Sequence, residues 1–282
     1  MGRLGRVESL FRYPVKSMLG ESVERVGIGE LGIADDRSWA VRDERRGDFF
    51  TAKRLAALMG CRGLGGLGGN APEIELPDGT RFAADAPDAA ARLSKALDHP
   101  VTLHRMGEPA PPPDDVETPD DPMADFNSMF ARKDAEPVPD FGTTPESLIE
   151  HMSRPDRPFV DLAPLLVMTR QSIDALAASA PGAKMDERRF RPSLLVDAEG
   201  GDRFPEQAWV GKRLRIGGVL IEAPMTCPRC VMTTHGFDDL PKDPAIMRSL
   251  VSEADGNLGV YATILEPGEI RVGDVVETVD SA

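Results

Sequence analysis

The stretch "KRLRIGGVLIEA", residues 212–223, carries the pattern that decides the fold. Leu214 and Ile216 alternate with arginines before a Gly-Gly pair, and a run rich in apolar residues follows the pair. Alternation with a period of two is typical of β-strands, and glycine is typical of the turns between them. We therefore expect strands here, with the glycines at a turn.

The same kind of pattern recurs along most of the chain. A Pro-Asp-Gly turn divides residues 73–85 into the two arms of a hairpin. Further strands are expected at residues 6–15, 36–43, 192–197, 258–265 and 268–279. Helices are expected at residues 87–98, 169–182 and 242–257. Strands outnumber helices, so the sequence predicts a β-dominated, barrel-rich α+β fold rather than a doubly wound sheet.

Charge and cysteine usage restrict the function and the compartment. The formal net charge of −14 repels phosphate backbones, which argues against nucleic acid as a partner. A membrane helix needs about 20 apolar residues in a row, and no such run is found. The N-terminus lacks an apolar signal-peptide core, and the three cysteines are an odd number. We expect a cytoplasmic protein without a membrane partner.

Composition also suggests how the chain is divided. Residues 107–145 are rich in proline and acid and poor in large apolar side chains, so they cannot build a core of their own. We predict an N-terminal domain at residues 1–106, an acidic, Pro-rich insert or linker at 107–146, and a C-terminal domain at 147–282. A mobile insert is favoured over a lid. "GLGGLG", residues 63–68, lacks the strand-before and helix-after context of a dinucleotide site and is interpreted as a turn.

Two of the three cysteines, Cys227 and Cys230, stand two residues apart in "CPRC". A structural zinc site needs four ligands, but a second CxxC is absent and the histidines are not paired at ligand spacing. A redox dithiol is disfavoured because the pair does not open a helix in a βαβ unit. Arg229 would stabilise a thiolate. From the residues alone, a reactive, metal-binding thiolate and an inert buried pair both stay open.

Several cationic and hydroxyl side chains lie in or beside predicted strands: Lys16 and Ser17 follow one, Arg37 stands near the start of one, and Arg191 immediately precedes one. Lys16 and Ser17 lie in "YPVKSMLG", Arg37 in "DDRSWAV", and Arg191 in "RRFRPSLLVD". Taken singly, each is typical of a solvated surface. Together, guanidinium, ammonium and hydroxyl groups could form a local pocket for an anionic cofactor despite the acidic surface.

Six segments in fixed order carry a family resemblance. They are "YPVKSMLGESV", "DRSWAVRD", "RRFRPSLLVD", "FPEQAWVGKRLRIGGVLIEA", "CPRCVMTT" and "GVYATILEPGEIRVGDVV". In these segments the chain resembles MOSC proteins with an N-terminal MOSC-type β-barrel domain, a group that includes amidoxime-reducing components and related bacterial reductases. The resemblance implies an N-terminal and a C-terminal β-barrel domain with a few flanking helices. It also implies a molybdenum cofactor, Mo-molybdopterin, with Cys230 as the metal ligand.

The resemblance assigns further roles. Lys16, Ser17, Arg37, Arg191 and Arg229 match positions that hold the cofactor. Ser193 stands where the family commonly has asparagine, which leaves pterin orientation open. Asp161 matches an acidic residue near the metal and would handle protons.

The activity implied is reduction of N-hydroxylated or N-oxide small molecules with electrons from a separate flavin, haem or iron–sulfur protein. The alternative is a non-catalytic carrier of the cofactor or of sulfur.

Overall fold

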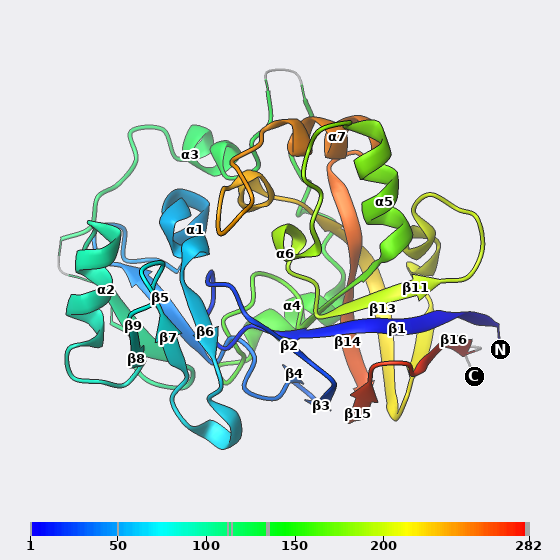
Figure 1. Cartoon of the computed structure of the whole chain (residues 1–282), viewed down its shortest axis with the longest axis horizontal. Coiled ribbons are helices and arrows are strands. Elements are labelled where there is room, and N and C mark those ends of the chain that lie inside the picture. Colours follow the sequence, from blue (N-terminus) through cyan, green and yellow to red (C-terminus); the bar gives the residue numbers. More distant parts are fainter. Residues whose placement is uncertain (1, 50, 112, 114, 134–135, 280–282) are drawn as a thin grey trace.

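A computed structural model of the chain describes residues 2–49, 51–111, 113, 115–133 and 136–279 (Figure 1). One sheet runs in the order β11-β10-β14-β13-β12-β16-β1-β2, and β1 also pairs with β11, which closes a seven-stranded barrel and leaves β2 (Glu21–Val23) outside it. The barrel strands are β1 (Arg3–Arg12), β10 (Leu165–Thr169), β11 (Leu194–Ala198), β12 (Arg213–Ile216), β13 (Val219–Pro228), β14 (Asn257–Glu266) and β16 (Val275–Val279). The predicted β-dominated α+β fold is confirmed.

The first strand of the chain lies in the same sheet as the last ones. In β1, Gly5 is paired with Ala198 of β11 on one side and with Val276 of β16 on the other. The side chains of Val7 and Leu10 point into the barrel core and are 2% and 0% exposed. The division at residues 106 and 147 stays a prediction, but the barrel itself is built from both ends of the sequence.

Smaller sheets hold the rest of the N-terminal part (Figure 1). β3 (Arg25–Gly29) pairs with β4 (Gly32–Ile33) and with β15 (Gly268–Arg271). β5 (Trp39–Asp43) pairs with β9 (Val101–Arg105), and β6 (Arg62–Leu64), β7 (Glu73–Glu75) and β8 (Arg81–Ala83) form a meander. A second core lies here, and Phe237 and Leu240 from the C-terminal part pack into it.

Helices cover the sheets and the barrel. The predicted helices are present as α2 (Ala89–Leu97), α5 (Arg170–Ser179) and α7 (Ala245–Ala254). The others are α1 (Thr51–Arg54), α3 (Pro122–Ser128), α4 (Glu146–Ser153) and α6 (Glu187–Phe190), with short 3-10 turns η1 (Ala56–Gly60), η2 (Leu67–Gly69), η3 (Pro205–Trp209) and η4 (Val231–Thr234). Within the described ranges, no helix is both long and apolar enough to cross a membrane.

Candidate functional site

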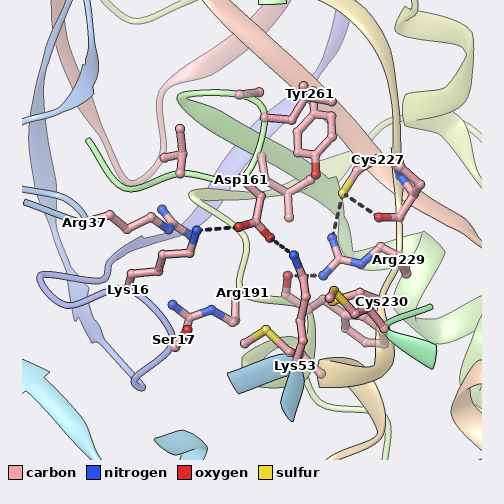
Figure 2. Close-up of a pocket in the computed structure, with 18 of the residues that line it drawn as sticks. Lys16, Ser17, Arg37, Lys53, Asp161, Arg191, Cys227, Arg229, Cys230 and Tyr261 are labelled. Carbon is pink, nitrogen blue, oxygen red and sulfur yellow. Dashed lines mark hydrogen bonds and ion pairs between the residues drawn. The ribbon is translucent and has the colours of Figure 1, made fainter. Parts of the chain in front are cut away.

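A cavity of about 320 Å³ lies where the two halves of the chain meet (Figure 2). Every residue that the sequence marked as a site residue lines it: Lys16, Ser17, Arg37, Asp161, Arg191, Ser193, Arg229 and Cys230. These side chains come from segments more than 200 residues apart in the sequence, so folding brings them together. Their individual roles stay predictions.

The two neighbouring cysteines have different environments. Cys230 is partly exposed, lines the cavity and immediately precedes η4. Cys227, at the end of β13, is 2% exposed and accepts a hydrogen bond from Nη1 of Arg229 at 3.0 Å. Burial raises the pKa of the Cys227 thiol, although Arg229 acts in the opposite direction. All three cysteines are free, so the pair is not a disulfide and Cys230 is the thiol with more access to the cavity.

The zinc interpretation finds no support in the part of the chain that the structure describes. No group of three or more His, Cys, Asp or Glu side chains is arranged there to hold a metal ion. Structural zinc takes four protein ligands. A metal at Cys230 would therefore have to bring most of its ligands with it.

Tyr13 holds two of the predicted arginines. Cζ of Arg191 lies 4.2 Å from the centre of the Tyr13 ring, and Cζ of Arg37 lies 4.8 Å from it. Both distances are in the range of cation–π attraction. Burial, followed by the charge of Arg37, lowers the pKa of Arg191 to about 10. Two guanidinium groups of the cavity lining thus share one buried aromatic ring behind them.

Ser17, Arg37 and Arg191 also share an uncommon backbone conformation. Their φ angles are +75°, +46° and +55°, in the left-handed region that L residues other than glycine rarely adopt. Such strain persists only where the surrounding structure imposes it, and it clusters at functional sites. The coincidence of three such residues on one cavity wall is independent support for a site here.

The arginines of "RRFR" do different things. Arg188 points to the surface and pairs with Asp186 and Asp239. Arg189 is fully buried and donates to the carbonyl oxygens of Thr233, His235 and Pro241 at 3.4, 2.8 and 2.7 Å. It thereby fixes the segment that follows Cys230. Arg191 has Nη1 bonded to the carbonyl oxygen of Met18.

Arg229 and Ser193 are both buried within the protein. The Arg229 side chain donates to Cys227 and, through Nη2, to the carbonyl oxygen of Phe190. Its Nε is buried and finds no hydrogen-bond partner among the described residues. The Ser193 hydroxyl accepts a hydrogen bond from the Leu166 amide at 3.2 Å. Ser193, which immediately precedes β11, therefore ties the start of that strand to β10 besides lining the cavity.

Asp161 connects two lysines across the cavity (Figure 2). Its Oδ1 lies 2.6 Å from Nζ of Lys16, and its Oδ2 lies 2.7 Å from Nζ of Lys53. Burial alone would raise the pKa of Asp161, but the two ammonium groups hold it well below its usual range. Asp161 is therefore an anion that accepts two charged hydrogen bonds. The protons at this place reside on the lysines.

Lys53 is a charged site residue that sequence reasoning missed. Burial alone would lower its pKa, but Asp161 and then a thiolate at Cys230 raise it. Two contacts position its helix α1: the Ala52 amide donates to Oγ of Ser17 at 3.4 Å, and the Ala52 carbonyl accepts from Nε2 of His235 at 2.9 Å. In the sequence, a lysine in "TAKR" looks like any surface lysine, and nothing marks it out.

Comparison with known proteins identifies both halves of the chain. The family model of the MOSC N-terminal beta barrel domain matches residues 4–97, and that of the MOSC domain matches residues 154–277. These ranges contain every predicted site residue.

Three curated relatives cover different shares of the chain. Mitochondrial amidoxime reducing component 2 from Homo sapiens is 33% identical over 131 residues, which is 42% of this chain and 38% of that protein. The protein of the same name from Bos taurus is 24% identical over 307 residues, 97% of this chain and 83% of its own length. Molybdenum cofactor sulfurase from Oryza sativa subsp. japonica is 26% identical over 80% of this chain and 28% of its own length.

Proposed function

The chain belongs to the MOSC domain proteins with an N-terminal MOSC β-barrel domain, and on that premise we propose that it is a molybdenum-cofactor-dependent oxidoreductase. It reduces N-hydroxylated or N-oxide small molecules. The observation that carries this proposal is the cavity itself. An accessible thiol, Cys230, lines it together with cationic side chains from both halves of the chain.

The residues present fit this cofactor. An anionic phosphate and a polar pterin need several donors held in a fixed array. Lys16, Arg37 and Arg191 supply positive charge, and the buried Nε of Arg229 still has a hydrogen to donate. We propose that these residues, with Ser17 and Ser193, hold the pterin and its phosphate, and that the thiolate of Cys230 is the protein ligand of the metal.

The cofactor, when bound, supplies the two-electron chemistry that removes an oxygen atom from the substrate. The protein has to supply protons. Converting N–OH to N–H consumes two electrons and two protons and releases water, so proton donors must lie within reach of the departing oxygen. Nζ of Lys16 and Nζ of Lys53 line the cavity, and as ammonium groups paired with Asp161 they would be its proton donors.

Lys16, Asp161 and Lys53 have different roles in supplying protons and charge. Burial lowers the pKa of Lys16, although Asp161 opposes the shift, so Nζ of Lys16 is the more readily released proton. Asp161 orients both ammonium groups. Lys53, whose pKa is raised, remains charged and supplies a positive charge beside the proposed metal ligand Cys230.

Electrons come from outside this sequence. The chain has three cysteines, fewer than the four that usually hold an iron–sulfur cluster. We propose a separate flavin, haem or iron–sulfur donor, and the net charge of −14 would favour a donor with a basic docking face. A cytoplasmic location remains a prediction.

Replacement of Cys230 tests the proposal. The protein is produced in a host that makes the cofactor, its molybdenum is measured, and benzamidoxime is offered with reduced viologen as the electron source. Cys230→Ser should retain its thermal unfolding midpoint and lose turnover by roughly a hundred-fold or more, because even indirect partners of metal ligands contribute 10- to 100-fold. Cys61→Ala is the matched control, since Cys61 is buried in the N-terminal core and does not line the cavity.

The result separates the alternatives. Wild-type protein that contains molybdenum but reduces no N-oxygenated compound would be a carrier of the cofactor or of sulfur rather than a reductase. Protein that contains zinc and no molybdenum would contradict both. Normal turnover by Cys230→Ser would remove the thiolate from its proposed role.

A further inference from the structure

Three aromatic rings from the predicted insert form one side of the cavity. We call Phe126, Phe130 and Phe141 the aromatic wall; all three line the cavity. Their ring centres lie 5.2, 5.8 and 6.2 Å apart, and the rings are tilted against one another by 46° to 75°. Tilted rings at these separations attract each other. An acidic segment with no apparent core thus contributes an ordered apolar surface.

This surface is only partly used for packing. Phe130 is 6% exposed, but Phe126 and Phe141 are 38% and 36% exposed. Ligand pockets are lined mainly by apolar and aromatic side chains, and clustered apolar rings that stay accessible in such a lining are able to contact a ligand. Packing within the insert explains the burial of Phe130. It does not explain why the rings of Phe126 and Phe141 stay partly exposed.

The aromatic wall is fixed to the chemical centre. The amide of Val231, the residue after Cys230, donates to the carbonyl oxygen of Met129 at 2.7 Å. On the other side, Asp125 accepts a hydrogen bond from Nη2 of Arg54 at 2.7 Å, and Arg54 directly follows Lys53. The wall is therefore bound to both segments that supply Cys230 and Lys53. This argues against a freely moving insert.

The same cavity also carries a cationic array. Lys16, Arg37 and Arg191 line it and suit an anionic group, whereas the aromatic wall suits a flat apolar body. We infer that Phe126 and Phe141 form an apolar subsite for an aryl group attached to the N–O group of the substrate. The inference rests on the proposed function and narrows it to N-oxygenated compounds with an aromatic substituent.

Binding without turnover tests the subsite directly. Oxidised full-length protein carrying its cofactor is titrated by calorimetry, without a reductant, with benzamidoxime and with acetamidoxime. The two compounds share the N–O group and differ in the ring. In Phe126→Ala and Phe141→Ala, the ratio of the benzamidoxime Kd to the acetamidoxime Kd should rise about two- to ten-fold, the equivalent of one lost aromatic contact.

Further variants test whether a change in the Kd ratio comes from a general disturbance of the insert. Phe126→Leu and Phe141→Leu retain apolar volume and should still raise the ratio, though by less. Met123→Ala and Val138→Ala are matched controls, because both residues are exposed in the same segment and neither lines the cavity. Molybdenum content should be equal in all variants.

The outcomes distinguish this inference from the proposed function. An unchanged ratio in the alanine variants, or an equal loss of affinity for both compounds, would overturn the aryl subsite. If wild-type protein with reduced viologen reduces neither compound, the reductase proposal fails. The binding ratio would then still decide whether the wall recognises an aromatic ring.

Discussion

At the scale of single residues, the charge balance of the cavity depends on Asp161. One carboxylate faces two ammonium groups, and the thiolate proposed at Cys230 would add a second negative charge near Lys53. Removing Lys53 would leave Asp161 with one partner and bring two anions together without a cation between them. The Asp161 side chain is 38% exposed to the cavity, so solvent offsets part of the charge that would be left uncompensated.

We therefore predict that Lys53→Met lowers turnover with reduced viologen roughly ten- to hundred-fold, the range typical of groups that support a metal ligand. Lys53→Arg should recover most of the loss, because a guanidinium restores the charge. Lys95→Met, on the exposed face of α2, is the control and should behave like the wild type. Equal losses in Lys53→Met and Lys53→Arg would show that positive charge alone does not account for the role of Lys53, and an unaffected Lys53→Met would exclude Lys53 from the site.

A site residue could be predicted from the sequence when it lies in a segment with a recognisable pattern. Lys16, Arg37, Arg191 and Cys230 lie in segments with recognisable patterns, and the structure brings all four to one cavity. Lys53 lies in a four-residue helix without any pattern. Its importance arises from a contact with a carboxylate 108 residues away in the sequence. No local signal encodes such a contact.

At the scale of elements, the short helix α1 positions Lys53 although it is only four residues long. A helix of one turn is unstable alone, because nucleation is unfavourable. Here Ser17 and His235 hold the two backbone groups of Ala52, and the ion pair of Lys53 adds a third anchor. His235 lies just beyond η4, so the segment after Cys230 and the helix that carries Lys53 are linked by one imidazole.

This link predicts a dependence of stability on pH. Burial lowers the pKa of His235 below 6.5, although the Ala52 carbonyl opposes the shift. As the pH falls below about 6.5, the unfolded chain takes up a proton that the folded protein resists, so stability decreases with falling pH. One such group changes the free energy of unfolding by at most about 1.4 kcal/mol per pH unit.

In His235→Gln the free energy of unfolding should depend less steeply on pH, because the amide can still donate to the Ala52 carbonyl oxygen but does not titrate. Urea unfolding at pH 7.5 and pH 5 measures the difference. His104 and His151, whose pKa values are also lowered by burial, stay in the variant, so the comparison isolates His235. Equal slopes for the wild type and the variant would contradict the assignment.

Elements with a clear period could be predicted, whereas of two strands that are buried at every position β5 was predicted and β10 was not. The alternating strands and three helices were found because their apolar faces repeat with the period of the element. β10 (Leu165–Thr169) is buried at every position, so it lacks the alternation by which strands are recognised. α3 and the aromatic wall lie in a segment whose composition favours disorder. Their order comes from contacts with Val231 and Arg54.

At the scale of the whole molecule, the decisive feature is that the barrel closes only through β1. Without residues 3–12, the edges of β11 and β16 would be unpaired, and the core would lose Val7 and Leu10. Burying each of these side chains contributes roughly 1.5–3 kcal/mol, a large part of a typical domain's stability. The boundary near residue 107 was predicted from composition, which depends only on the residues of each segment. Which strand pairs with which is a non-local property.

The barrel's dependence on β1 can be tested by rearranging the chain. Gly2 and Thr278 exchange hydrogen bonds of 3.0 and 2.9 Å, so the two ends lie side by side (Figure 1). A circular permutant that joins the ends with a short Gly-Ser linker and begins at Glu108, at an exposed bend, keeps every strand pair. We expect it to unfold cooperatively near the wild-type midpoint in circular dichroism. Residues 147–282 alone should show no cooperative transition, since both strands flanking β1 are left open. Cooperative folding of that piece would show that the C-terminal domain is autonomous and that β1 is dispensable.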